Sequence, residues 1–285
     1  MAGDRYRDRY PAAPEPLPSP VADSHCHLDI AFGEAPTPDV SEALAKAADV
    51  GVTAIVQVGI DVPSSQWAAA AASEHEHVWA AVALHPNEAP QIYLEAGAAA
   101  LEAQWAEIAE LAALPQVRAV GETGMDFFRT APELRAVQEE SFRVHIDIAK
   151  RTGTTLVIHD RDAHDDVLRI LDDAGAPDTV VLHCFSGDEA FAQAVTERGF
   201  YCSFAGNVTF KNAEMLRVAL GVVPTELVLV ETDAPFLTPV PNRGRPNASY
   251  QLPNTVRAVA QVRGWELSEA CEVFLRNTER AFGPL

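Results

Sequence analysis

The sequence is poor in basic residues and lacks any long hydrophobic run. It contains 21 lysines and arginines against 41 aspartates and glutamates, a formal net charge of −20. This charge disfavours broad, non-specific binding to nucleic acid or to anionic membranes, although it leaves room for nucleic acid held at one local site. A membrane-spanning helix needs roughly 18 or more apolar residues in a row. No such stretch is present, so no membrane span is expected.

Cysteine is scarce too. The chain has four cysteines, none of them in a C-x-x-C pair: Cys26, Cys184, Cys202 and Cys271. We expect reduced thiols and a cytoplasmic protein. Residues 1–20 lack the apolar core of a signal peptide and are rich in proline and charge. That composition predicts a disordered tail, followed by one domain over residues 21–285.

Short apolar or β-branched runs recur along the rest of the chain and predict eight strands. They lie at residues 21–25, 53–59, 78–84, 117–122, 154–159, 180–185, 200–206 and 227–233. Most are almost continuously apolar, as strands buried on both faces are. Stretches with an apolar stripe lie between or after them and predict helices, at residues 39–51, 131–153, 188–199 and 250–282. This alternation favours an α/β fold, a (β/α)₈ TIM-like barrel. The alternative, a doubly wound dinucleotide-binding sheet, would need a Gly-x-Gly-x-x-Gly after its first strand, and none is there.

Histidines and carboxylates lie where the predicted strands end. In the stretch "VADSHCHLDI", His25 and His27 are two positions apart, and side chains at that spacing lie on the same face of a strand. Other strand ends carry further residues of this kind: His85, Glu122, His159, His183 and Asp233. In a barrel the carboxyl ends of all strands meet on one face, where active sites lie. We therefore expect these residues, distant in sequence, to converge.

The chemistry of this set indicates a metal site. Each residue alone has an ordinary structural explanation: a strand-end histidine can be hydrogen-bonded, Glu122 can cap a helix, and Cys26 and Cys184 are expected to be small buried hydrophobes. Together, histidine and carboxylate suit Zn, Mn, Fe or Ni better than Ca or Mg alone. The set also exceeds the needs of one tetrahedral ion. Two ions bridged by a carboxylate would use it fully, as phosphoesterases require.

Five motifs carry a family resemblance. In order along the chain, "DSHCHLD", "AVGETGMDFFR", "VIHDRDA", "HCFSG" and "ETDAPFLTP" resemble the TatD family of metal-dependent nucleases, within the amidohydrolase-like barrels. The resemblance covers residues 21 to about 280 and implies a TIM-like barrel with two divalent ions, of Zn, Mn, Mg, Ni or Co. It implies that one ion is held by His25, His27, Glu122 and Asp233. It implies that the other is held by Glu122, His159 and His183, with Glu122 bridging.

The resemblance also implies a substrate side to the site. His85 matches a family histidine near the substrate phosphate. The family's "RG..NEP" region reads "RGRPNAS" here, so Arg243, Gly244 and Asn247 match while Ala248 replaces the usual glutamate. The "GxHP" element reads "ALHP", with Ala83 where glycine is common. These departures concern the rim of the site rather than its metal ligands.

The expected activity is hydrolysis of a phosphodiester at the 3′ end of single-stranded DNA or RNA, the substrate that the resemblance implies. Glu122 and Asp233 are the candidate catalytic residues. Asp233 would accept a proton from the attacking water, or would act as a ligand only. Arg161, Arg129 and Arg243 are candidates to contact phosphates, although each could equally be a surface ion-pair partner. The oligomeric state stays open, with a monomer favoured.

Two other functions fit parts of the pattern. A barrel fixes the place of the site rather than its substrate, so an amide, ester or aminoacyl-tRNA ester could be the target on the same scaffold. Many such enzymes bridge their ions with a modified lysine on the fourth strand, and Glu122 at that place favours the nuclease branch. The protein could also hold metal without turnover. An intact ligand set argues against that hypothesis.

Overall fold

Eight parallel strands form the centre of the molecule. The computed structural model describes residues 9–284, and its single sheet has the strand order β1 to β8. The strands are β1 (Val21–Cys26), β2 (Val52–Val58), β3 (Val78–Val82), β4 (Val117–Asp126), β5 (Thr155–Arg161), β6 (Val180–Leu182), β7 (Tyr201–Phe204) and β8 (Val228–Val230). The two edges meet where Cys26 pairs with Ala234 beyond the end of β8. The predicted α/β barrel is confirmed.

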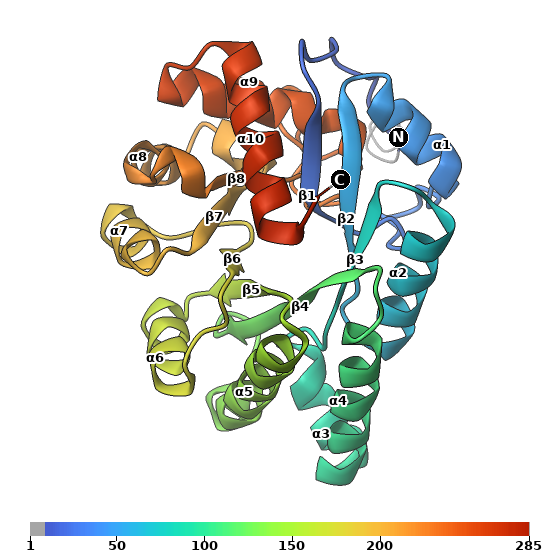
Figure 1. Ribbon diagram of the computed structural model, residues 1–285, viewed down its shortest axis with the longest axis vertical. Coiled ribbons are helices and arrows are strands. Elements are labelled where there is room, and N and C mark those ends of the chain that lie inside the picture. Colours follow the sequence, from blue (N-terminus) through green and yellow to red (C-terminus); the bar gives the residue numbers. More distant parts are fainter. Residues whose placement is uncertain (1–8, 285) are drawn as a thin grey trace, which may run out of the picture.

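Helices surround the strands (Figure 1). They are α1 (Val40–Ala48), α2 (Val62–Glu74), α3 (Glu88–Ala96), α4 (Ala98–Ala112), α5 (Arg135–Thr152), α6 (His164–Ala174), α7 (Glu189–Glu197), α8 (Glu214–Val222), α9 (Leu252–Arg263) and α10 (Leu267–Phe282). Short 3₁₀ turns are η1 (Pro132–Leu134), η2 (Gly206–Thr209), η3 (Thr225–Leu227) and η4 (Ser249–Gln251). The predicted helices correspond to α1, α5, α7 and the α9–α10 pair.

Local sequence explains several of these boundaries. Helix α2 begins at a capping box, in which the Asp61 side chain accepts from Ser64 N (2.8 Å) and the Ser64 hydroxyl accepts from Asp61 N (3.0 Å). Helix α5 ends at Gly153, whose φ of 67° is the left-handed conformation that a residue without Cβ adopts at low cost. Gly97, with φ of 82°, separates α3 from α4, so two helices rather than one connect β3 and β4.

Burial on both faces of the sheet explains the apolar runs. Alternate residues of β2, Val56 and Val58, belong to a small apolar cluster that also includes Phe282 of α10. The neighbouring Ile55 belongs to a larger cluster shared with the surrounding helices. Because side chains of a strand alternate between faces, one cluster lies on the inner face of the barrel and the other beneath the helices. Strand β3 is buried at every position.

The N-terminal segment differs from the prediction of disorder in the part that the structure describes. Residues 9–20 lie along the η4–α9 region, and their carbonyl groups accept hydrogen bonds from Arg245, Tyr250, Gln251 and Arg257. Leu17 is buried, and its N–H donates to Val50 O (3.0 Å). A proline-rich segment has few donors, but it retains its carbonyl acceptors, and these hold it in place. Residues 1–8, the rest of the predicted tail, lie outside the described residues.

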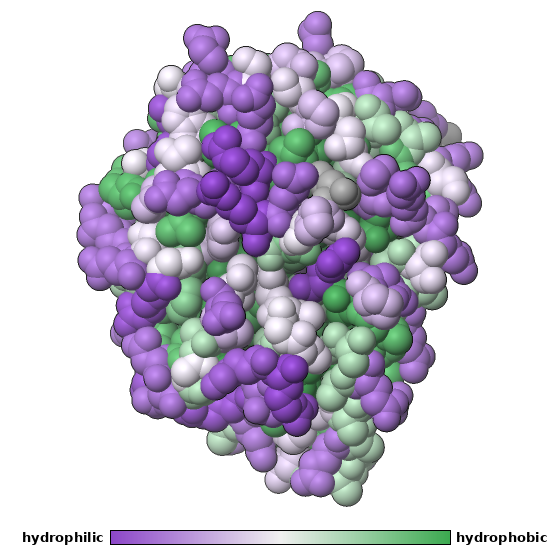
Figure 2. Space-filling view, viewed as in Figure 1, coloured by the Kyte–Doolittle hydropathy of each residue, from purple (hydrophilic) through white to green (hydrophobic). Residues whose placement is uncertain are grey.

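The surface matches the acidic composition. Figure 2 shows hydrophilic side chains over much of one face, with hydrophobic side chains in small separate patches. Over residues 9–284, no helix combines the length and the apolar character that crossing a membrane requires.

Candidate metal centre

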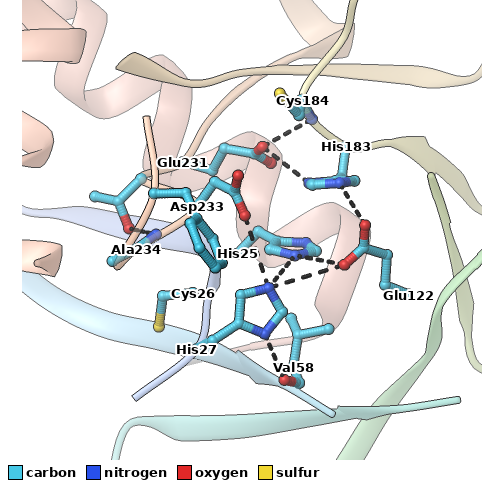
Figure 3. A network of polar contacts seen from close by, with 12 residues as sticks. His25, Cys26, His27, Val58, Glu122, His183, Cys184, Glu231, Asp233 and Ala234 are labelled. Carbon is cyan, nitrogen blue, oxygen red and sulfur yellow. Dashed lines mark hydrogen bonds and ion pairs between the residues drawn. The ribbon is translucent and has the colours of Figure 1, made fainter. Parts of the chain in front are cut away.

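The predicted residues meet at the carboxyl ends of the strands. His25 lies next to Cys26, the last residue of β1. Glu122 and His159 lie on β4 and β5, four and two residues before those strands end. His183 directly follows β6, and its N–H donates to Ile158 O (3.0 Å). Figure 3 shows the side chains from different strands pointing toward one another, whereas the sulfur of Cys26 points away from them. The convergence follows from the barrel, because parallel strands end on one face.

His27 and His183 come directly after their strands, whereas His85 and Asp233 lie further along the loops that follow β3 and β8. Strand β3 ends at Val82, and the following loop carries His85, whose N–H donates to Ile60 O (2.8 Å). Strand β8 ends at Val230, and Asp233 is placed by a hydrogen bond from its N–H to His25 O (2.9 Å). Strand β1 thus positions the loop that follows its neighbour β8.

Glu122 is the centre of the cluster. Its Oε1 lies 2.6 Å from His159 Nδ1 and 2.8 Å from His183 Nε2. Its Oε2 lies 3.4 Å from His25 Nε2 and 3.8 Å from His27 Nε2. The two oxygens of one carboxylate therefore face two different pairs of imidazoles. This is the arrangement in which a carboxylate can join two cations.

Two more groups border this centre. Asp233 Oδ1 lies 3.7 Å from His27 Nε2, and its side chain is 14% exposed, so it faces both the histidine and the opening above. His85 Nε2 lies 3.5 Å from Glu122 Oε1. The Nδ1 atom of His85 accepts from Asn87 N (3.1 Å), which places the proton of the neutral imidazole on Nε2.

Burial and charge act in opposite directions on Glu122. Burial alone would raise the pKa of its carboxyl, but the charges of His183 and His85 and hydrogen bonds from His159 and His183 hold that pKa well below its usual range. The charges of Glu122 and Glu231 raise the pKa of His183 well above its usual value, although burial acts to lower it. Glu122 is therefore a carboxylate over the whole physiological pH range.

The Nε2 atoms of His25 and His27 face each other. Burial, and then the nearby His183, lower the pKa of His25 to about 3, so its ring is neutral. The Nδ1 atom of His27 lies 2.8 Å from Val58 O and donates to it, which leaves Nε2 without a proton in the neutral ring. The two Nε2 atoms are 3.3 Å apart. His25 Nδ1 is buried and has no hydrogen-bond partner among the described residues.

This donor set fits cations. Three groups have one ligand atom per residue, all within 4.8 Å of one another: His25, His27 and Glu122; His85, Glu122 and His159; and His25, His183 and Glu231. A divalent ion can bind the lone pairs of several ligand atoms at the same time, whereas a proton joins only two of them. Imidazole nitrogens with carboxylate oxygens are ligands for Zn, Mn, Ni or Co.

Glu231 and Asp126 are part of the site and were not singled out in the sequence. Glu231 is fully buried, and its Oε1 lies 3.1 Å from His183 Nδ1 and accepts from Cys184 N (2.7 Å). Asp126 Oδ2 lies 3.3 Å from His159 Nε2. The spacing argument used for His25 and His27 would have found Glu231, because it lies two residues before Asp233.

A buried aspartate joins the first and last strands beneath the site. Asp23 accepts hydrogen bonds from Thr232 N (2.9 Å) and Thr232 Oγ1 (2.5 Å), and from His25 N (3.3 Å). Burial raises its pKa to about 7, although these hydrogen bonds act to lower it. Asp23 thereby positions the backbone on both sides of the cluster.

A cavity of about 570 Å³ opens above these residues, within the usual size range of small-ligand sites. His27, His85, Glu122, His159, His183 and Asp233 all line it. Arg129 and Arg161 also line this cavity, but Arg243 does not. Arg243 is exposed and stacks on Phe210, with its guanidinium carbon 4.2 Å from the ring centre.

Comparison with known proteins decides the family. A family model described as "TatD related DNase" matches residues 22–283. The chain belongs to the TatD family. A Mycobacterium tuberculosis protein named "Uncharacterized metal-dependent hydrolase TatD" is 44% identical over 270 residues, which covers 92% of this chain and 98% of that protein. A Citrobacter rodentium protein named "3'-5' ssDNA/RNA exonuclease TatD" is 33% identical over 255 residues, with 86% and 92% covered.

Solved structures agree with this TatD assignment. The crystal structure of YjjV, a TatD homolog from Escherichia coli, superposes with a TM-score of 0.82 at 27% identity and covers 93% of this chain and 98% of that one. The predicted family and the TIM-like barrel are thus confirmed. This TatD protein is a metal-dependent hydrolase by family, with histidine and glutamate clusters that could hold the metal.

Proposed function

We propose that this TatD hydrolase removes nucleotides from the 3′ ends of single-stranded DNA or RNA with the help of two divalent ions. The observation that carries the proposal is the position of Glu122, whose two oxygens face separate histidine pairs. A bridged two-ion site is suited to in-line displacement at phosphorus. The name of the Citrobacter relative supports the same substrate class.

The proposed ligands follow the geometry around Glu122. His25, His27, Glu122 and Asp233 would hold one ion, and Glu122, His159 and His183 would hold the other. When bound, the ions would lower the pKa of water toward neutrality and offset charge on the phosphate. The ligand set is compatible with Zn, Mn, Ni or Co, and its carboxylates also permit Mg.

Residues of the chain itself would handle the proton and the phosphate. Asp233 opens into the cavity and is the proposed acceptor of the proton released by the attacking water, while Glu122 fixes the two halves of the site. His85 carries its proton on Nε2 and could donate to a phosphate oxygen, because Asn87 N occupies its Nδ1. Arg161 and Arg129 line the cavity and have no ion-pair partner in the described part of the chain, so both are available for phosphates. Arg243, outside the cavity, would reach only nucleotides further from the cut.

Shape and charge favour strand ends as the substrate. A formal charge of −20 provides no long-range attraction for DNA, so affinity must arise near the cleaved bond. The ligand groups are largely buried at the base of a cavity, which suits a free strand end better than the middle of a duplex. We expect modest affinity and little sequence preference.

The test is cleavage of short 5′-labelled single strands, resolved on a sequencing gel with Mg, Mn or Zn supplied. We expect a ladder that shortens stepwise from the 3′ end. Arg161→Ala should slow the reaction and leave the metal content unchanged, whereas Arg151→Ala on the exposed face of α5 should do neither. Internal cuts in blunt duplex DNA would overturn the exonuclease assignment. Absence of cleavage with every metal would favour an amide or ester substrate instead.

We further propose that the protein acts as a monomer in the cytoplasm. Its four cysteines are all free, which suits a reducing compartment. Size-exclusion chromatography with light scattering would show a mass of about 30.7 kDa for a monomer, and twice that value would contradict it.

A further inference from the structure

Two phenylalanines at the cavity are more exposed than their apolar rings would favour. Phe128, in the turn after β4, is 64% exposed, and Phe236, after β8, is 39% exposed. Single exposed apolar residues are common and need no explanation by themselves. These two differ because each is tied to the cavity: Phe236 lines it, and Phe128 stacks with Arg161, which lines it.

Phe128 is displayed on a rigid turn. On one side, Phe127 N donates to Arg161 O (2.9 Å), and on the other, Arg129 N donates to Asp126 Oδ1 (2.8 Å). The Arg161 guanidinium carbon lies 3.8 Å from the centre of the Phe128 ring. The Arg161 guanidinium thus stacks on the Phe128 ring, and the N–H groups at the edge of the guanidinium can still donate to a phosphate.

Phe236 is fixed by a buried amide. Its N–H donates to Asp233 O (2.8 Å), and its carbonyl accepts from Asn247 Nδ2 (2.7 Å). Asn247 is 1% exposed and also donates to Thr232 O (2.9 Å), so the turn is tied to the strand end that carries Asp233. Because the backbone of this turn is fixed, only the ring torsions of Phe236 lose conformational entropy when a ligand stacks on the ring.

The two rings lie on opposite sides of the ligand cluster. Phe236 follows β8, and its ring centre is 6.5 Å from that of His27, which directly follows β1. The Phe128–Arg161 pair belongs to the ends of β4 and β5. In the strand order β1 to β8, closed by the Cys26–Ala234 bridge, these two positions face each other across the barrel. A chain crossing the cavity between them would bring a phosphate over Glu122.

We propose that Phe236 and the Phe128–Arg161 pair are stacking platforms for the two bases that flank the cleaved phosphate. The proposal rests on the proposed exonuclease function and specifies its ligand: a strand whose last two bases are unpaired. Every base has a π-face, so stacking selects for single strands without reading sequence. A polyanion without bases would lack both contacts, and so would a duplex end whose bases remain paired.

Ring removal combined with base removal tests the proposal. Phe236→Leu and Phe128→Leu keep an apolar side chain without the ring, and Phe236→Trp restores a ring. The probes are 5′-labelled single strands with a normal nucleotide or an abasic tetrahydrofuran unit at the last or the penultimate position. Tyr93→Leu is the matched control, because Tyr93 is 42% exposed on α3 and does not line the cavity. Metal content and thermal unfolding report whether each variant is intact.

We expect each leucine variant to lower kcat/KM for the normal strand by about 5- to 150-fold, the effect of losing one base–aromatic stack. The abasic unit at the position served by the lost ring should remove most of this difference, and the two variants should respond at different positions. Phe236→Trp and Tyr93→Leu should resemble the wild type. Equal losses on normal and abasic strands, or no loss at all, would overturn the stacking proposal while the nuclease function stands. A wild-type protein that cleaves no strand would overturn the function and this proposal together.

Discussion

Replacing Glu231 with glutamine removes the negative charge beside His183 and keeps a side chain of nearly the same shape. The Glu231 carboxylate is buried, lies 3.1 Å from His183 Nδ1 and accepts from Cys184 N (2.7 Å). A carboxylate behind a metal-binding histidine fixes the tautomer and raises the basicity of the ring, and its loss typically reduces metal affinity 10- to 100-fold. At 1.36 kcal/mol per tenfold change, the expected loss is about 1.4–2.7 kcal/mol for the ion that His183 would hold.

The assay is competition between a coloured chelator and metal-stripped protein, with Mn or Zn, at a pH of about 8. Wild type and variant are compared at the same pH, because protons compete with the metal for His183 and Glu231 raises the pKa of this ring. We expect one binding constant to fall within the range above and the other to change little. Glu189→Gln, the same change at an exposed position of α7, should leave both constants unchanged. Wild-type affinity for both ions in Glu231→Gln would refute the role assigned to this carboxylate.

Three further outcomes are expected. Glu122→Ala should reduce the metal content from about two ions per chain to almost none, whereas His183→Ala should weaken the binding of mainly one ion. Elemental analysis that finds wild-type metal content in Glu122→Ala would contradict the bridging role. The rate of strand cleavage should rise from about pH 5 toward pH 8. Glu122 and Glu231 raise the pKa of His183, so acid protonates this ligand and weakens metal binding. A rate that does not change with pH when metal is in excess would contradict this expectation. Burial lowers the pKa of His145 to about 4, below the value of about 6.5 for an exposed histidine, so the unfolded chain binds more protons at this residue between these pH values. His145 should therefore make the metal-free protein about 3 kcal/mol less stable at pH 4 than above pH 6.5. Urea unfolding of wild type and His145→Gln at both pH values measures this difference, and equal pH dependence of the two proteins would exclude it.

The barrel and its cluster could be predicted because the signals are local. Parallel strands buried on both faces are apolar over their whole length, and a polar residue that follows such a run stands out. His25 and His27 needed only the period of a strand to be placed on one side. Strand lengths were less predictable: β4 continues to Asp126, past the predicted end at Glu122, whereas β8 stops at Val230.

Long-range contacts explain what was not predicted. The segment from residue 9 to 20 has the composition of a disordered tail, but side chains more than 200 residues away, such as Arg257 and Tyr250, donate to its carbonyl groups. Nothing in the local composition reveals these donors. Similarly, Arg243 matches the first residue of a family motif, yet the structure places it on Phe210 outside the cavity. The role of such residues depends on partners that only the folded chain brings near.

Reactivation of metal-stripped protein tests most directly whether Glu122 joins two ions in a single-strand exonuclease site. Stripped protein would receive Mn or Zn in steps while bound metal and cleavage of a 5′-labelled single strand are measured on the same samples. We expect the 3′-to-5′ ladder to appear as the second ion binds and to reach its full rate at about two ions per chain. Full activity with one ion per chain, or with none, would contradict the two-ion site.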